Sequence, residues 1–545
     1  MKLMYKLLFF PILFCISFTA KAQMTTNGVT LYGNEWIDYS KEYLKIPIAA
    51  DGIYRLSGEE LSKNGFNIAN IPSNQYKMYY LGKEIPLFVN SANPLTASDF
   101  IEFFAKKNRS EVDSFLYKRA KQEMGNPKYS LFNDTSAYFL TWSATTPAKR
   151  FNVIANDLTN APAKQAYFMH ALDTVFTESF DKRYNSLVSG DELKSSQYVV
   201  CEGFASNYAA ERTINLKPTD IFTAGPAAKL DVYAEWRNLL KETKVTPQFH
   251  KMNILVNGKS VRKDSSFLGT SYGLKILTND LPLSEVKTTT PVTIKSYGNS
   301  KDDHRIAYIT LSYPRTFTFG ESQIFTFNSE ASATKQQFVI EKIKAGTIPI
   351  LYDLSNQTKV VGTVTGTSAA FVLPPSATPR ELVFYLDNSA KSAIVKKKVK
   401  FENYKNAAPT YLIISNSRLY KDKSGKNWVQ EYADYRNSAA GGNYKAAVIN
   451  IEQLYDQYAY GIDRHAMAMR NFTNYAVKNW SPTHLFLLGR GITYDEIRKL
   501  DAIQDESFFV PTHGYPGSDN LVSANASTSN QRSLRVEFPL LRATM

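Results

Sequence analysis

The chain has 545 residues, too many for one hydrophobic core, because single cores stop growing near about 250–300 residues. Aromatic residues make up 13% of it, with 34 Tyr and 33 Phe, which excludes a disordered polar chain and favours β-rich domains. The net charge is +14, but the basic residues are scattered, so the charge does not indicate a nucleic-acid-binding face.

The first 22 residues have the pattern of a secretory signal peptide. Lys2 and Lys6 precede a short apolar run, and Ala20 and Ala22 provide the small residues of a cleavage site. The run is shorter than the ~20 residues that span a membrane, and no later segment has the pattern of a transmembrane helix. Removing this segment removes three lysines and no acid, which leaves a net charge of +11. We expect an exported protein of the periplasm, the outer membrane or the cell surface.

Residues 30–150 are expected to form an N-terminal β-rich domain. Ser57 and Glu60 have the spacing of a capping box at the start of a short helix. The stretch 76–89 alternates between apolar and polar residues on both sides of Gly82, which predicts a β-hairpin.

Two further β domains are expected, at 165–315 and 316–402. In the first, Asn257-Gly258 divides two short strands and is the strongest short hairpin signal. Alternating strands at regular spacing predict a sandwich there, with jelly-roll topology. A second set of short strands predicts a small sandwich of its own. The lysine run at 396–398 is expected on an exposed strand face or edge, with an anionic envelope surface as the functional alternative.

The period changes near residue 405. TYLIISN at 410–416 is a continuous apolar run, typical of a strand buried on both faces. Helical stretches at 427–439 and 464–480 alternate with the strand patterns YKAAVIN and HLFLLG. This order predicts the start of a parallel α/β sheet over 405–545.

The segment LFLLGRGITYDEIRK, residues 485–499, is the first candidate for a functional loop. Gly489 and Gly491 fit part of a dinucleotide-binding pattern, but Tyr494 replaces its third glycine, and the P-loop pattern is absent. We therefore expect no nucleotide cofactor. Because ligands of open α/β sheets bind beyond the carboxyl ends of the strands, the loop from 489 to about 520 is expected to border a site.

Metal and thiol chemistry are weakly indicated. Asp302-Asp303-His304 is expected to form a turn before a strand, and neither His465 nor His484 has a metal-ligand partner at a recognisable spacing. We expect no metal. Cys201 is the one cysteine after the signal peptide, so it cannot form an internal disulfide. It is expected to be a buried structural thiol, with a catalytic nucleophile as the alternative.

Four segments carry a resemblance to a known family. They are AAPTYLIISN, EYADYRNSAAGGNYKAAVINIEQLYDQYAYGI, AMRNFTNYAVKNWSPTHLFLLGRGITYD and VPTHGYPGSDN. In this order they resemble the opening half of a gingipain-like cysteine peptidase domain, in particular the sortase-like PorU branch of type IX secretion. N-terminal segments such as NEWIDYSKEYLKIPIAADGIYRL are similar to the same branch.

The resemblance implies a caspase-like α/β sheet with a histidine and a cysteine as the catalytic dyad. In the family both follow the segment that matches Ser518-Asp519, but this sequence contains no His and no Cys after Asp519. No catalytic residue is therefore assigned, and a frameshift or truncated reading frame is expected. Residues 525–545 do not have the pattern of the next strand, so we expect the strand near Leu485–Leu488 to be an unpaired edge of the sheet. Many relatives have an acid where this chain has Arg490, which puts a role for an acid there in doubt.

The resulting hypothesis is a multidomain, mainly β protein followed by an incomplete caspase/gingipain-like parallel sheet. The candidates for the rim of the active site are Arg490, His513, Asp519 and Asn520. By resemblance, the partners are secreted cargo proteins, with surface glycolipid as acceptor in the sortase-like members and no nucleic acid. The alternative is a non-enzymatic, β-rich envelope protein whose sandwich domains bind cargo or glycan.

Overall fold

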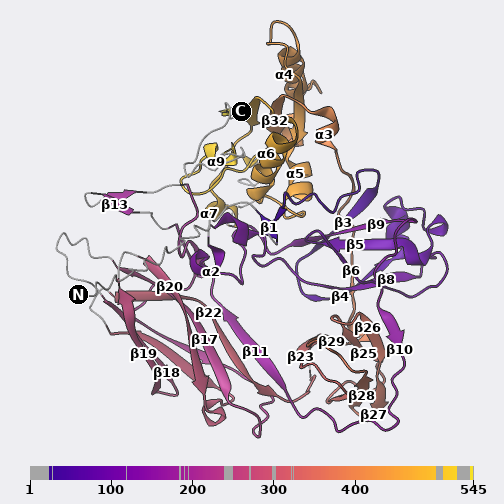
Figure 1. Ribbon diagram of the computed structural model, residues 1–545, viewed down its shortest axis with the longest axis vertical. Helices are drawn as coiled ribbons and strands as arrows, with labels where there is room; N and C mark the ends of the chain where they lie inside the picture. The colour runs from indigo at the N-terminus through magenta and orange to yellow at the C-terminus, as the bar shows by residue number, and fades with distance from the viewer. Residues whose placement is uncertain are drawn as a thin grey trace, which may run out of the picture.

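The computed structural model describes most of the chain between residues 24 and 543. It leaves out residues 27–28, 118, 183–185, 189–190, 194–195, 239–248, 269–271, 298–301, 321, 323, 499–506 and 524–539. The predicted signal peptide lies outside the described residues. Three β domains and one α/β domain make up the described part (Figure 1), which confirms the expected fold class. None of its helices has the length and apolar character needed to cross a bilayer.

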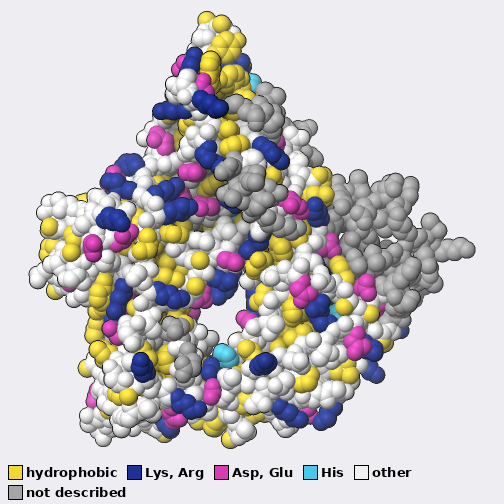
Figure 2. Space-filling model, turned by 180° about the vertical axis from the view of Figure 1, so that it is seen from behind, with side chains coloured by type: hydrophobic (Ala, Val, Ile, Leu, Met, Phe, Trp, Pro, Cys, Tyr) yellow, Lys and Arg dark blue, Asp and Glu magenta, His cyan; other side chains and the backbone are white. Residues whose placement is uncertain are grey.

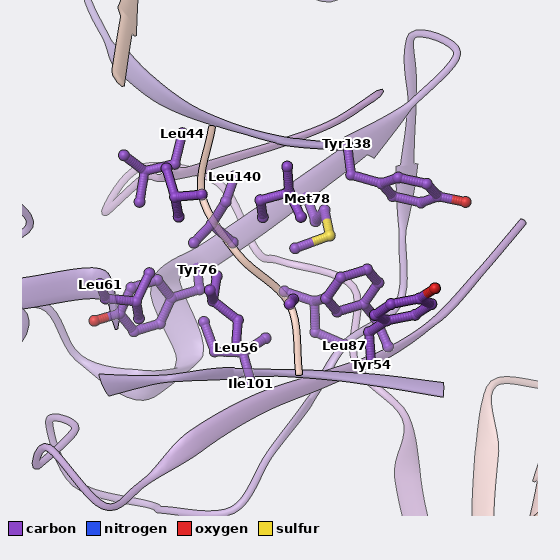
Figure 3. Close-up of a cluster of buried hydrophobic side chains, with 14 of the residues drawn as sticks. Leu44, Tyr54, Leu56, Leu61, Tyr76, Met78, Leu87, Ile101, Tyr138 and Leu140 are labelled. Carbon is purple, nitrogen blue, oxygen red and sulfur yellow. The ribbon is translucent and has the colours of Figure 1, made fainter. Parts of the chain in front are cut away.

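Two packed sheets form the N-terminal domain, in the strand orders β31-β3-β9-β5-β6 and β30-β4-β8-β7. The strands are β3 (Glu42–Ile48), β4 (Gly52–Ser57), β5 (Tyr76–Tyr80), β6 (Lys83–Ile85), β7 (Phe88–Val89), β8 (Phe100–Ala105), β9 (Ser136–Trp142), β30 (Lys391–Ser392) and β31 (Lys397–Lys400). Leu44 and Leu140 of the first sheet face Leu56 and Ile101 of the second in the core (Figure 3). Strands from residues 391–400 thus pair with the N-terminal strands rather than with those of the small sandwich.

The expected hairpin around Gly82 and the expected helix after Ser57 are both present. β5 pairs with β6 across Leu81-Gly82. The Ser57 side chain accepts a hydrogen bond from the Glu60 amide at the start of α1 (Gly58–Lys63). The Glu60 carboxylate accepts a hydrogen bond from the amide of Val395, at 2.9 Å, and so contacts the returning chain.

The second domain is an eight-stranded sandwich. Its strands are β11 (Phe168–Val175), β16 (Glu211–Leu216), β17 (Ala228–Asn238), β18 (Phe249–Val256), β19 (Lys259–Leu268), β20 (Tyr272–Leu281), β21 (Thr290–Ser296) and β22 (Asp302–Arg315). They form the sheets β11-β22-β17-β20 and β16-β21-β18-β19, the interleaved order of a jelly roll. The hairpin at Asn257-Gly258 is confirmed, with φ values of 50° and 79° that match a type I′ turn.

The expected turn at Asp302-Asp303-His304 is wrong. These residues begin β22 and pair with Asn238, Arg237 and Trp236 of β17. The main reason is that β17 is long. Its pairing with β22 continues beyond the apolar residues of β22 from which that strand was predicted. His304 is buried, and its Nδ1 lies 2.9 Å from Ser296 Oγ.

The small sandwich has a core rich in phenylalanine. Its sheets are β10-β26-β25-β29-β23 and β24-β28-β27. The strands are β10 (Asn152–Ile154), β23 (Phe325–Ser329), β24 (Gln336–Ile340), β25 (Pro349–Asp353), β26 (Thr358–Val361), β27 (Thr363–Thr365), β28 (Ser368–Leu373) and β29 (Arg380–Leu386). Phe327, Phe338 and Phe384 pack between the two sheets. Together with the other two β domains, this sandwich surrounds an opening through the molecule (Figure 2).

The C-terminal domain contains a parallel sheet in the order β33-β32-β34-β35. Its strands are β32 (Tyr411–Ser415), β33 (Ala446–Asn450), β34 (His484–Leu488) and β35 (Leu540–Ala543), and its main helices are α4 (Trp428–Asn437), α5 (Ile451–Tyr458) and α6 (Met467–Trp480). Alternate residues of β32 face opposite sides, as a strand requires. Ile413 packs with α4 on one side, and Leu412 and Ile414 pack with α5 and α6 on the other.

The expectation that residues 525–545 lack the next strand is wrong, because β35 lies within them. Residues Leu540–Ala543 pair in parallel with Leu485–Leu488. β34 is therefore an interior strand, not the unpaired edge expected from the sequence. The four-residue segment is too short to be recognised from its periodicity.

The lysine run beside β31 joins the N-terminal domain to the α/β domain. β31 is an edge strand, as expected, but Lys396 lies 2.8 Å from the Asp463 carboxylate and Lys397 lies 2.9 Å from that of Asp456. Lys45 of β3 contacts both acids, at 2.6 Å and 2.8 Å. Lys45 and Asp456 are almost fully buried, with side chains 3% and 1% exposed. These contacts fix the α/β domain against the N-terminal sheet.

The remaining short strands and helices belong to none of the sheets described above. They are β1 (Thr25–Thr26), β2 (Val29–Thr30), β12 (Ser179–Asp181), β13 (Ser186–Val188), β14 (Asp191–Leu193), β15 (Gly203–Ala205), α2 (Ala120–Glu123), α3 (Tyr404–Ala407), α7 (Tyr494–Ile497) and α9 (Asn520–Ser523).

Candidate functional site

The candidate site begins where β34 ends at Gly489. This glycine has a φ of +146°, and a Cβ there would lie 2.8 Å from the Cβ of Phe509. The turn therefore requires glycine for both its conformation and its close approach. The main-chain oxygen of Arg490 then accepts hydrogen bonds from the amides of Phe509 and Val510, at 3.0 and 3.2 Å. The described residues of 489–519, called the strand-end loop below, are thus drawn together at the carboxyl end of the sheet.

Three of the four predicted rim residues lie at the surface of this loop or next to it. Arg490 and Asn520 are exposed, and Asp519 is half-buried. The hydroxyl of Thr512 donates to the Asp519 carboxylate at 3.1 Å, which holds the turn over 512–519 closed. Arg490 and Asn520 are available to contact a ligand beyond the strand ends.

His513, the fourth candidate, is buried. Only 1% of it is exposed, and its ring lies 5.2 Å from that of Tyr198, edge to face. Burial, together with the charge of Arg470, lowers the pKa of His513 to about 3, so the imidazole is neutral at physiological pH. Its side chain packs inside the domain interface rather than lining the loop surface.

A segment of the jelly-roll domain covers this side of the strand-end loop. The Ser196 hydroxyl donates to the main-chain oxygen of Pro516. Gly514, with a φ of +68°, approaches so closely that a Cβ would lie 1.7 Å from the main-chain oxygen of Ser196. Lys182 adds an ion pair to Asp495 at 2.8 Å. Residues 196–202, called the covering segment below, therefore pack directly on the predicted rim.

Cys201 lies in the covering segment but has the surroundings of a structural thiol. It is fully buried, and its Sγ lies 3.0 Å from the main-chain oxygen of Gly273, to which it can donate. Its own amide donates to the main-chain oxygen of Glu123 at 2.8 Å. A nucleophilic thiolate needs a base and access to substrate, whereas this thiol contacts main chain in a closed interface.

The histidines do not form a metal centre within the described residues, where no three His, Cys, Asp or Glu side chains gather. His465 accepts the Met467 amide at Nδ1, at 3.2 Å, so its Nε2 carries the proton that it shares with Asp113 at 3.1 Å. His484 stacks on Tyr411, with ring centres 5.2 Å apart. Sequence reasoning missed the Asp113–His465 pair because its members are 352 residues apart.

A second candidate site is a cavity of about 220 Å³ between the N-terminal domain and the small sandwich. Aromatic side chains dominate its lining, with Tyr80, Phe104, Tyr138 and Phe151 among them and Lys106 beside them. The rings of Tyr80 and Tyr138 stack in parallel, 4.6 Å apart. Lys106 is held by Glu381 at 2.7 Å. Flat apolar faces beside a charged pair could hold one ring-sized group.

Comparison with known proteins identifies the C-terminal part of the chain. Residues 404–532 match the model of peptidase family C25, whereas no curated protein sequence matches the chain. Among solved structures, dimeric latent PorU from Porphyromonas gingivalis is similar at a TM-score of 0.58 and 14% identity, over 93% of this chain and 48% of that one. The chain thus spans about half the length of this relative. The expected resemblance to gingipain-like cysteine peptidases is confirmed.

Two other similar structures are a β-porphyranase of glycoside hydrolase family 86 from Bacteroides plebeius and the tandem CBM51 modules of a family 98 glycoside hydrolase from Streptococcus pneumoniae SP3-BS71. The match to the first includes 50% of this chain and 35% of the β-porphyranase, at 8% identity. The second covers 50% and 77% at 10% identity. Their TM-scores of 0.16 and 0.15 carry no argument about fold or function.

Proposed function

Because residues 404–532 belong to peptidase family C25, we propose that this chain is the substrate-recognition and scaffold part of an exported gingipain-like peptidase of the PorU type. Its substrates would be secreted cargo proteins, received at the strand-end loop. The parallel sheet β33-β32-β34-β35, with a glycine turn at its carboxyl end, carries this proposal. In such sheets the ligand lies beyond the strand ends, where Arg490 and Asn520 are exposed.

In this proposal the chain positions cargo but does not itself supply the attacking thiolate. Cys201 is buried against main chain, and no cysteine or histidine follows Asp519 in the sequence. Arg490 offers a charged donor for a peptide carbonyl or carboxylate, and Asn520 offers both a donor and an acceptor. Transfer of cargo to an amine on surface glycolipid is the finer part of the proposal and rests on the family resemblance alone.

The aromatic cavity supports a second candidate function. Stacked tyrosines beside a Lys–Glu pair suit a sugar ring or an aromatic side chain of cargo, and they lie in a β domain rather than at the sheet. In that case the protein would bind glycan or cargo without any peptidase role.

Photo-crosslinking separates the two candidates. A benzoylphenylalanine replaces either Asn520, at the strand-end loop, or Lys83, an exposed residue of β6 near the cavity. Each full-length variant is mixed with secreted cargo proteins and, separately, with envelope glycan. The proposal predicts cargo crosslinks from position 520 and none above background from position 83. Crosslinks confined to position 83 would favour the binding-protein candidate and contradict the first.

A further inference from the structure

Helix α4 and the loop 421–426 before it form an exposed end of the α/β domain. This end lies opposite the jelly-roll domain and the small sandwich (Figure 1), and Figure 2 shows hydrophobic and basic side chains gathered there. Trp428 is 52% exposed and Tyr435 is 50% exposed. Tyr432 is half-buried, and its ring lies 6.4 Å from that of Tyr435. At helical spacing these three aromatic residues follow one side of α4.

The indole of Trp428 is held in place although half of it is exposed. Its Nε1 donates to the Asp422 carboxylate at 2.6 Å. The same carboxylate accepts from the amides of Ser424 and Lys426, at 2.8 and 3.1 Å, which closes the loop. The Lys426 ammonium lies over the indole, 4.0 Å from the ring centre. A side chain fixed in this way loses little conformational entropy when it binds a partner.

The same end carries more basic than acidic side chains. Residues 421–445 contain five Lys or Arg and three Asp or Glu, a net charge of +2. Apart from Asp422, the acids also have partners, since Glu431 lies 3.6 Å from Lys426 and Asp434 accepts from Gln430 at 2.9 Å. Two further lysines are exposed and form no ion pair within the described residues. These are Lys421 and Lys423.

The chemistry of this end fits the surface of an anionic bilayer. Trp and Tyr prefer the boundary between lipid and water, and lysine side chains reach the phosphates of lipids from there. A sugar ring would stack on the face of an exposed indole, but Lys426 occupies one face of Trp428. Protein interfaces are poor in lysine, which argues against a protein partner. A helix at a projecting end can also approach a flat surface without contact from the β domains.

We propose that α4 and the loop 421–426 dock onto an anionic lipid bilayer, with Trp428 and Tyr435 among the headgroups and Lys421 and Lys423 on lipid phosphates. The contact is peripheral and uses both apolar and charged groups, so it weakens as salt screens the charges. This inference does not depend on the proposed peptidase role.

Flotation of the purified full chain with lipid vesicles tests the proposal. Wild type should float with vesicles of equimolar phosphatidylcholine and phosphatidylglycerol, and not with phosphatidylcholine alone. Trp428→Ala and the double variant Lys421→Gln/Lys423→Gln should each weaken the affinity for the anionic vesicles about tenfold or more. The matched controls are Ile348→Ala and Lys344→Gln, which change exposed residues of the small sandwich and should leave the affinity unchanged.

Trp428 also reports on its own position, because the other four tryptophans are only half-buried or less exposed than it is. Anionic vesicles made with brominated phosphatidylcholine should quench the fluorescence of wild type. Trp428→Phe should keep an aromatic ring in the headgroups, and therefore float, but lose most of this quenching. Absence of wild-type flotation with anionic vesicles, or undiminished flotation of Trp428→Ala, would overturn the proposal.

Discussion

Glu102 of β8 is a fully buried acid that joins the N-terminal domain to the small sandwich. Arg55 of its own domain donates to it at 2.6 Å. Tyr385 and Lys359 of the small sandwich approach it at 2.8 and 3.0 Å. Burial by itself would raise the pKa of Glu102, but the charge of Lys359, a hydrogen bond from Tyr352 and the charge of Arg55 hold it below its ordinary value.

Glu102→Gln should therefore lower the stability of the chain by about 3–5 kcal/mol, since it leaves Lys359 buried without an anion. Chemical denaturation followed by circular dichroism measures this. Because the pKa is lowered on folding, the difference from wild type should be complete above the unfolded value of about 4.3. It should shrink as the pH falls below that value.

Glu381→Gln is the matched control for this prediction. Glu381 forms an ion pair with Lys106, and their side chains are 43% and 40% exposed, respectively. Loss of this exposed pair should lower the stability by about 0–1 kcal/mol. Equal effects of the two substitutions would show that the Glu102 contacts do not join the domains.

Residue-scale interactions of this kind were beyond sequence reasoning. Arg490, Asp519 and Asn520 could be placed at a strand end because local glycines and an apolar run mark it. His513 is close to them in sequence, yet it is buried by Tyr198, which lies more than 300 residues earlier.

At the scale of elements, the contact between the covering segment and the strand-end loop depends on Gly514. Gly514→Ala should displace the covering segment, because the added Cβ would lie 1.7 Å from the Ser196 oxygen at a φ of +68°. Hydrogen exchange measured by mass spectrometry should become faster in peptides spanning 196–202 and 507–520.

Gly320→Ala is the control for the backbone conformation. Gly320 has a φ of +61° but no heavy atom within 4 Å of an added Cβ. Gly320→Ala should lower the stability only by the cost of placing alanine in the left-handed conformation, about 1–2 kcal/mol. It should leave hydrogen exchange in the two peptides unchanged. Unchanged exchange in Gly514→Ala as well would mean that the covering segment is not held there.

The elements that sequence patterns predicted best are those with long, regular periodicity. The hairpin at Asn257-Gly258, the strand at 411–415 and the helix ending at Trp480 are all present. β35 was missed because four residues carry too little pattern. The start of β22 was read as a turn because Asp302 and Asp303 are poor strand formers, although pairing with β17 overrides that preference.

At the scale of the whole molecule, buried ion networks hold the domains in one arrangement. The Lys45–Asp456 contact ties the α/β domain to the N-terminal sheet, and the Glu102 contacts tie that domain to the small sandwich. The N-terminal domain and the small sandwich, joined in this way, border the opening seen in Figure 2 together with the jelly-roll domain. Such contacts join residues hundreds of positions apart, so composition and periodicity could predict the domains but not their assembly.

The central claim is that this chain has the sheet of a C25 peptidase but that Cys201, the one cysteine after the predicted signal peptide, is structural. The most direct test is hydrolysis of a fluorogenic peptide library by the purified chain, before and after iodoacetamide, with Cys201→Ala in parallel. We expect no hydrolysis above the Cys201→Ala background and no alkylation of Cys201 until the protein is unfolded. Peptide turnover that alkylation of Cys201 abolishes would contradict the account.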